Sequence, residues 1–136
     1  MKIHPYLSFN GTCDAAFKFY EQCTGGKILF KMTYGESPMA AQTPADLHKR
    51  ILHVTLQIGD YLLQGGDAPP QYFSQPQGFS VSIDVDNSAE AERLYKALSE
   101  FGQIKMPLQE TFWAARFGMF VDQFGTPWMI NCHKQG

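Results

Sequence analysis

Cysteine, net charge and long apolar runs are all scarce in this chain of 136 residues, and each scarcity excludes a class of protein. Three cysteines, at positions 13, 23 and 132, are too few and too scattered for a disulfide framework or a zinc ribbon. Reduced thiols and a cytoplasmic location are therefore expected. No apolar run approaches the roughly 20 residues of a membrane span, and the N-terminal MKIHPYLSF lacks the apolar core of a secretory signal. A net charge of −2 with scattered Lys and Arg excludes a nucleic-acid-binding face.

Aromatic residues, in contrast, make up 14% of the chain and crowd into residues 112–131. Two apolar runs, 116–121 and 128–131, flank the turn sequence DQFGTP at 122–127. This pattern predicts a β-hairpin, in which Gly125 supplies the positive φ and Pro127 starts the second strand. Asp122 is interpreted as a turn residue whose carboxylate accepts a hydrogen bond from the backbone two residues further on.

The first half of the chain predicts a strand, a helix, a strand and a hairpin. Residues 4–9 form the first strand, and Thr12 is the expected N-cap of a helix that ends at Gly25-Gly26. Residues 27–34 predict a strand, residues 35–46 a long loop of the kind that often carries function, and residues 51–64 a hairpin about Gly59-Asp60. Residues 65–78 read as a linker. The helix is predicted from apolar residues at helical spacing, namely Cys13, Ala16, Phe17, Tyr20 and Cys23.

The second half repeats this order. Residues 79–85 alternate as a strand, and Asn87 with Glu90 forms a capping box for the next helix. We expect Gly102 to stop that helix, and residues 103–108 to form a weaker strand before the hairpin at 112–131. The helix is again predicted from an apolar stripe, made of Ala91, Leu94, Tyr95, Leu98 and Phe101.

The repeat predicts the architecture. Each half has one helix and four strands, which is too little to bury a core of its own. We therefore expect an α+β fold in which two βαβββ modules, about 1–68 and about 78–134, form a curved, partly closed sheet with the helices outside. The whole chain, 1–136, would be a single domain.

Several sequence segments carry a resemblance to a known family. They are the stretch YLSFNG at 6–11, Phe19-Tyr20, Tyr34-Gly35, His53 within ILHVTLQIGDYLLQGGDAPP, Phe117-Gly118, and DQFGTPWMIN at 122–131. Through them nearly the whole chain resembles the vicinal oxygen chelate superfamily of glyoxalase, bleomycin-resistance and ring-cleaving dioxygenase proteins. More narrowly it is similar to the PhnB-like branch, which often carries a demethylubiquinone methyltransferase name. The resemblance implies the fold of paired βαβββ modules.

The resemblance also implies four places for metal ligands, on the first and last strand of each module. Carried onto this chain, they fall near His4, close to Gln64, on Phe79 or Ser80, and on Met129. Only His4 and Gln64 are suitable, because Phe and Met do not ligate a hard or borderline divalent ion well. We therefore expect no cofactor, and a divalent metal held by His4 and Gln64 with His53 or Asn131 remains an alternative.

Two residues are candidates for acid–base chemistry, His53 and Tyr34. Alternation puts His53 on the less apolar face of its strand, where either a structural hydrogen bond or a general base fits. The candidate ligand pocket is aromatic, as walls for small planar or apolar ligands are. Arg116 is its one cation, either meeting an anionic substrate group or paired at the surface. The predicted pocket residues are Phe30, Tyr34, Gln64, Phe79, Phe112, Trp113, Arg116 and Trp128.

Three functions are compatible with these residues. The first is a small-molecule-binding protein with a metal-free aromatic pocket, which the resemblance further predicts to be a homodimer. The second is a metal-dependent lyase, isomerase or dioxygenase, and the third a metal-free enzyme using His53 or Tyr34. A methyltransferase is not expected, because neither Gly25-Gly26 nor Gly65-Gly66 leads from a parallel strand into a helix. Neither a nucleic acid nor a membrane is an expected partner.

Overall fold

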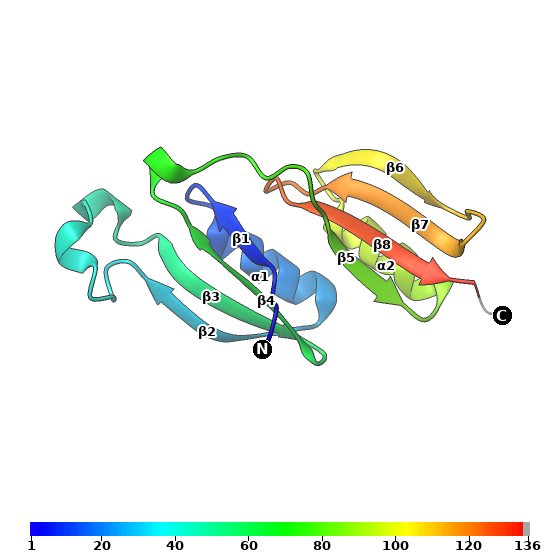
Figure 1. Ribbon diagram of the computed structural model, residues 1–136, viewed down its shortest axis with the longest axis horizontal. Helices are drawn as coiled ribbons and strands as arrows, with labels where there is room; N and C mark the ends of the chain where they lie inside the picture. Colours follow the sequence, from blue (N-terminus) through cyan, green and yellow to red (C-terminus); the bar gives the residue numbers. More distant parts are fainter. Residues whose placement is uncertain (135–136) are drawn as a thin grey trace. The chain divides into compact units, whose positions relative to one another are not determined.

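The computed structural model describes residues 1–134, and the chain divides into two compact units, Met1–Ser74 and Gln75–Gly136. Each unit has one helix and one open four-stranded sheet, and the chain runs strand, helix, then three strands (Figure 1). The α+β class and the two βαβββ modules are therefore confirmed. The first unit holds β1 (Tyr6–Phe9), α1 (Cys13–Thr24), β2 (Lys27–Thr33), β3 (Ile51–Ile58) and β4 (Tyr61–Asp67). The second holds β5 (Val81–Val85), α2 (Ser88–Leu98), β6 (Gln103–Gln109), β7 (Ala114–Val121) and β8 (Pro127–His133).

Both sheets have the same topology. The strand orders are β1-β4-β3-β2 and β5-β8-β7-β6, so the first and last strands of each unit are neighbours. That pair is parallel in both units, and the remaining pairs are antiparallel. The parallel pair requires a crossover, which the helix and the two middle strands supply. Several predicted boundaries shift; for example, β5 starts at Val81, and β4 extends to Asp67 into the predicted linker.

Helix α1 covers one face of the first sheet with the predicted apolar stripe. The buried residues of α1 are Cys13, Ala16, Phe17, Tyr20 and Cys23. Gly25 ends the helix in the left-handed conformation, as expected. The predicted cap is wrong, because Thr12 makes no side-chain capping bond. Instead Oδ1 of Asp67, at the end of β4, accepts hydrogen bonds from the backbone N–H groups of Gly11 (2.8 Å) and Cys13 (3.1 Å).

The long connection predicted between β2 and β3 is present and has local structure of its own. It contains two short 3₁₀ helices, η1 (Ala40–Gln42) and η2 (Ala45–Leu47). His48 ties the segment together, because its Nε2 lies 3.0 Å from the carbonyl oxygen of Ala40 and 2.9 Å from that of Thr43. A third 3₁₀ helix, η3 (Pro70–Tyr72), follows β4.

Helix α2 begins as the sequence predicts and ends differently. The side chain of Asn87 accepts a 2.8 Å hydrogen bond from the N–H of Glu90, which is one half of the capping box. The last helical residue is Leu98, and Ser99 occupies the C-cap in a right-handed conformation. Gly102 is therefore not the cap. Its place next to the β7–β8 turn leaves no room for a side chain, since a Cβ there would collide with the backbone of Val121 and Asp122.

The β7–β8 turn is organised by Asp122, as predicted. Its buried carboxylate accepts hydrogen bonds from the backbone N–H of Phe124 (2.8 Å) and of Thr126 (3.0 Å) through Oδ1. Through Oδ2 it accepts a bond from the indole N–H of Trp128 (2.8 Å). These bonds hold the β7–β8 turn together and tie Trp128, near the start of β8, to that turn.

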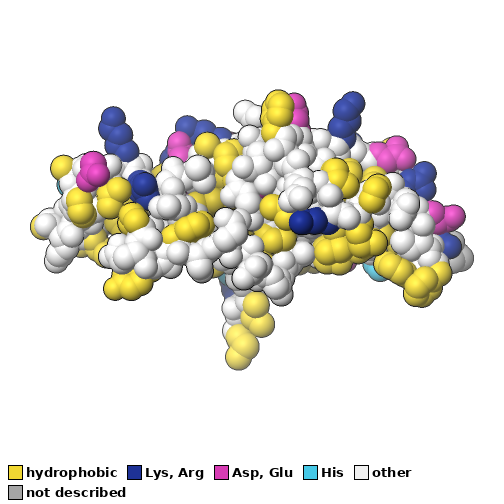
Figure 2. All heavy atoms as spheres, turned by 90° about the horizontal axis from the view of Figure 1, so that it is seen from above, with side chains coloured by type: hydrophobic (Ala, Val, Ile, Leu, Met, Phe, Trp, Pro, Cys, Tyr) yellow, Lys and Arg dark blue, Asp and Glu magenta, His cyan; other side chains and the backbone are white. Residues whose placement is uncertain are grey.

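The surface carries charges of both signs and several large apolar side chains. In the face drawn in Figure 2, Lys and Arg are interspersed with Asp and Glu, and hydrophobic side chains appear between them. Among residues 1–134, no helix is long and apolar enough to cross a membrane. The exposed aromatic side chains are Tyr6, Phe30, Tyr61, Tyr72, Phe79, Phe101, Phe112 and Trp113.

Candidate functional site

The first unit presents a sheet face that α1 does not cover, here called open face 1. Val54 and Leu56 of β3 pack toward α1 and are almost fully buried, so the alternate residues of each strand point the other way. The strand register aligns four of these residues across the sheet. They are Tyr6 on β1, Gln64 on β4, Thr55 on β3 and Phe30 on β2.

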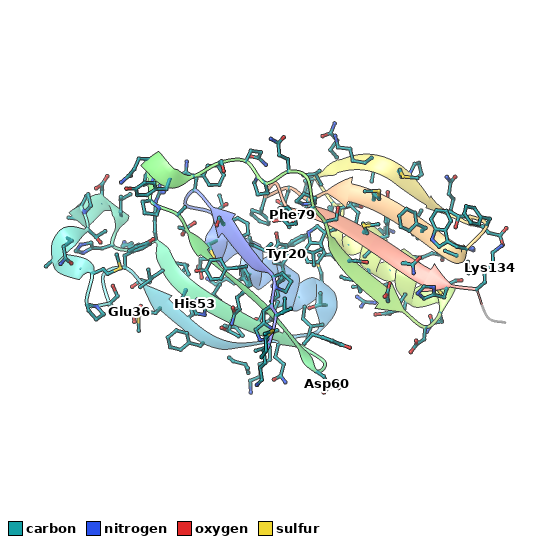
Figure 3. The ribbon with its side chains drawn as sticks, viewed as in Figure 1. Tyr20, Glu36, His53, Asp60, Phe79 and Lys134 are labelled. Atoms are coloured by element: carbon teal, nitrogen blue, oxygen red, sulfur yellow. The ribbon has the colours of Figure 1, made fainter. Side chains whose placement is uncertain are left out.

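His53, labelled in Figure 3, lies on open face 1 and contacts two aromatic rings, those of Tyr6 and Phe30. Its ring centroid is 5.6 Å from that of Tyr6 and 6.0 Å from that of Phe30. Its Nε2 lies 3.0 Å from Oγ1 of Thr55. The predicted face of His53 is confirmed by this placement. The imidazole of His53 therefore forms part of an aromatic surface, and its Nε2 is hydrogen-bonded to the hydroxyl of Thr55.

Tyr6 is a member of this face that the sequence analysis did not select. Its hydroxyl donates to the carbonyl oxygen of Leu52 (3.2 Å), and burial raises the pKa of the phenol above its ordinary value. The hydroxyl lies next to Gly66, where a Cβ would stand 2.7 Å from the Tyr6 oxygen. Gly66 therefore leaves space for this hydroxyl. The alternation of Tyr6 against buried Leu7 and Phe9 was the signal available in the sequence.

The two candidate metal residues of the first unit are not opposite each other. Gln64 pairs with Tyr6 in the parallel β1–β4 ladder, and its N–H donates to the carbonyl oxygen of Pro5 (3.1 Å). His4 precedes the strand. The residue that directly faces Gln64 is thus a phenol, which is a poor ligand while it is neutral.

The corresponding pair of the second unit also lacks metal donors. Met129 on β8 pairs with Ser82 on β5, and the predicted positions Phe79 and Ser80 precede that strand. A thioether and a neutral hydroxyl are unsuited to a hard divalent cation. Within residues 1–134, no three His, Cys, Asp or Glu side chains lie close enough to hold a metal ion together. The donor set at the superfamily's usual positions therefore does not fit a divalent metal.

The second unit has its own uncovered face, here called open face 2, and a groove of about 640 Å³ lies on it. Met119 and Met129, which pair across β7 and β8, form its apolar floor, and Phe79 borders it. Ser80, Gln103 and Lys105 add polar groups. An apolar floor with a few polar groups around it is the usual composition of a small-molecule site.

A second cluster on open face 2 is aromatic and polar. Rings of Phe112, Trp113 and Phe117 stack edge to face, with centroids 4.7 Å and 5.3 Å apart. Phe117 pairs with Asn131, whose Nδ2 donates to Oδ1 of Asp84 (3.3 Å) and lies 3.0 Å from Nε2 of His133. Oδ1 of Asn131 is buried and has no hydrogen-bond partner.

Two predicted pocket residues lie on the helix-covered side of the second sheet. Trp128 is 1% exposed and pairs with Phe120, whose ring packs on Tyr95 of α2 at 5.2 Å. Arg116 reaches α2, where its Nε lies 3.3 Å from a carboxylate oxygen of Glu92. Both side chains point to the face of the sheet that α2 covers, because side chains alternate between the two faces along a strand. Trp128 is therefore a core residue, and Arg116 forms an ion pair with α2 at the surface.

Tyr34 is separated from the other candidates. It follows β2, is buried, and donates from its hydroxyl to the carbonyl oxygen of Asp67 (2.7 Å). Burial, and then the charge of Asp67, raise the pKa of the phenol, so the group stays protonated at neutral pH. It lines a cavity of about 200 Å³ beneath the segment that connects β2 to β3.

This fold and these strand pairs define the class of the protein. The chain belongs to the Glyoxalase/Bleomycin resistance protein/Dioxygenase superfamily, whose family model matches residues 2–130. A relative, protein YjdN of Escherichia coli (strain K12), is 36% identical over 143 residues, which cover 99% of this chain and 97% of YjdN.

Two solved structures share the fold of this chain. Protein PA1353 from Pseudomonas aeruginosa is 46% identical, with a TM-score of 0.91 over 99% of each chain. A putative 3-demethylubiquinone-9 3-methyltransferase, PhnB protein, from Bacillus cereus is 21% identical, with a TM-score of 0.81 over 97% of this chain and 99% of that chain. At that identity the likeness shows the fold alone.

Proposed function

We propose that the chain binds a small, partly apolar molecule in the groove on open face 2. The observation that supports the proposal is the groove of about 640 Å³ with Met119 and Met129 on its floor. Met129 stands where the resemblance places a metal-binding carboxylate, so this position contributes apolar contact where catalytic members would supply a ligand. Thioethers are polarizable and flexible, and they pack well against planar rings. Binding without a metal is the function that these side chains support best.

A neutral planar probe tests the proposal. Titration of 1-naphthol into the whole chain, followed by amide NMR shifts, is expected to give saturable shifts at Ser80, Met119 and Met129. Met129→Glu should weaken binding about fivefold, because roughly 1 kcal/mol of apolar contact is replaced by a carboxylate. Met32→Glu is the matched control. Met32 is half-buried on β2 of the first unit and does not line the groove, so binding should not change. Equal binding by Met129→Glu would overturn the proposal.

One observation favours a second candidate, a metal-dependent enzyme of the same superfamily. Asp84 and Asn131 pair across β5 and β8, and His133 lies two residues further along β8. If the Asn131 amide were rotated, its unpartnered oxygen would replace the nitrogen between the Asp84 carboxylate and the His133 ring. Two oxygens and one imidazole nitrogen form a donor set for a divalent ion, which would supply Lewis-acid chemistry when bound. Elemental analysis distinguishes the two candidates.

Homodimerisation remains a prediction of the resemblance. A monomeric mass in sedimentation equilibrium at micromolar concentration would contradict it.

A further inference from the structure

The first unit contains a cavity of about 200 Å³ that is separate from the groove on open face 2. Its walls come from the segment between β2 and β3 and from the start of η3, and it shares no lining residue with the groove on open face 2. The volume corresponds to about six or seven water molecules at about 30 Å³ each, which suits a short organic molecule. The apolar wall residues are Met39, Pro44, Leu47, Pro69 and Pro70.

Among the described residues that line this cavity, Arg50 is the only charged one. Its Nη1 donates to Oδ1 of Asn10 (2.9 Å), and no carboxylate of residues 1–134 lies within ion-pair distance of its guanidinium. The guanidinium lies over Gly11, where a Cβ would be only 3.2 Å from Cζ and Nη2. Gly11 has a φ of +102°, so the backbone there both requires glycine and leaves space for the cation.

The buried carboxylate of the first unit does not neutralise Arg50 by contact. Both oxygens of Asp67 are taken by backbone N–H groups: Oδ1 by Gly11 and Cys13, and Oδ2 by Ile51 at 2.9 Å. A guanidinium has five N–H donors, and one acceptor is in place here. Arg50 is therefore a half-buried cation with donors to spare, at the wall of an apolar cavity.

The walls of the cavity are held in place by the protein itself. Besides the two contacts of His48, the N–H of Gly35 donates to the carbonyl oxygen of His48 (3.0 Å). The hydroxyl of Ser37 donates to the carbonyl oxygen of Tyr34 (2.7 Å), and the hydroxyl of Thr43 donates to that of Met39 (2.7 Å). A segment braced in this way loses little freedom when a ligand binds, which favours affinity.

We propose that this cavity binds a small carboxylate with a short apolar body, whose anionic group pairs with Arg50 and whose chain lies against Met39, Leu47 and the prolines. An Arg guanidinium matches a carboxylate in geometry and charge, and the apolar walls select against fully polar anions. The site is independent of the groove, because the two are lined by different units.

Hexanoate and its neutral analogue hexanamide are the probes. In amide NMR titrations of the whole chain, hexanoate is expected to give saturable shifts at Thr43, Leu47 and Ala68. Hexanamide should bind about tenfold more weakly, because it lacks the charge-assisted pair. Arg50→Gln should weaken hexanoate about tenfold and leave hexanamide unchanged. Lys49→Gln removes the same charge from an adjacent exposed residue that does not line the cavity, and it should not alter the affinity.

A second variant keeps the test decisive if Arg50→Gln does not fold. Ala68→Leu leaves the guanidinium in place and fills part of the cavity, and it should abolish the hexanoate shifts. Equal affinity of hexanoate and hexanamide for the natural chain, or unchanged hexanoate binding by either variant, would overturn the proposal. So would hexanoate shifts confined to Ser80, Met119 and Met129, which would assign the probe to the groove.

Discussion

Asp67 joins three elements of the first unit, namely β4, the start of α1 and the start of β3. It is 3% exposed, ends β4, and accepts three backbone hydrogen bonds from the start of α1 and the start of β3. A buried carboxylate is costly unless its oxygens are satisfied, and here the donors are main-chain groups that would otherwise be orphaned. The residue therefore acts as a helix cap supplied from a distant strand.

We predict that Asp67→Ala destabilises the chain by about 3 kcal/mol, because three partly or fully buried N–H groups lose their acceptor. Urea unfolding followed by circular dichroism measures this. Asp60→Ala is the control. Asp60 lies at the exposed tip of the β3–β4 hairpin, labelled in Figure 3, and its removal should change stability by less than about 0.5 kcal/mol. Equal effects of the two substitutions would show that Asp67 is not a cap.

At the scale of elements, both helices are preceded by a residue of a type that favours N-capping, but only one of the two residues caps its helix. Thr12 and Asn87 are both good capping residues by type. Asn87 makes the capping bond, whereas Thr12 is replaced in that role by Asp67. The difference arises from the sheet, since β4 delivers a stronger acceptor to α1.

We predict that Asn87→Ala lowers the free energy of unfolding by about 1 kcal/mol and that Thr12→Ala changes it by only a few tenths. The pair is measured in parallel by urea unfolding. A cost for Thr12→Ala as large as that for Asn87→Ala would mean that Thr12 caps α1 in solution.

Local sequence patterns predicted the helices and strands, because helical spacing and strand alternation of apolar residues are visible within a few neighbouring positions. The same alternation also explains what the pocket prediction missed. Trp128 and Met129 are adjacent in one strand, so only one of them can face the groove. Predicting Trp128 as a pocket residue together with Phe112 and Trp113 ignored this parity, because Trp128 lies in the core. Asp67 and the β1–β4 register depend on pairings across more than fifty residues, which no local pattern contains.

At the scale of the whole molecule, the potential metal-ligating side chains of both units decide whether the chain binds a divalent metal. The usual positions fall on His4, Gln64, Phe79 or Ser80, and Met129, and in the sheets Gln64 lies opposite Tyr6 and Met129 opposite Ser82. Only His4 and Gln64 are ordinary ligands among them, and these two donors are fewer than a protein normally uses to hold a divalent ion. The alternative set of Asp84, Asn131 and His133 requires the amide of Asn131 to rotate away from the carboxylate to which it now donates.

We therefore predict that untagged protein, purified without chelator, contains far less than one equivalent of nickel, zinc, manganese or iron by elemental analysis. Adding these ions should leave the melting temperature unchanged, because a metal that bound the folded state would raise it. About one metal per chain would contradict the prediction, and two variants would then locate it. Loss in His4→Ala would assign the metal to the first unit, and loss in Asn131→Ala would assign it to the Asp84 cluster. The second result would also account for the unpartnered oxygen of Asn131, since that atom would be a ligand.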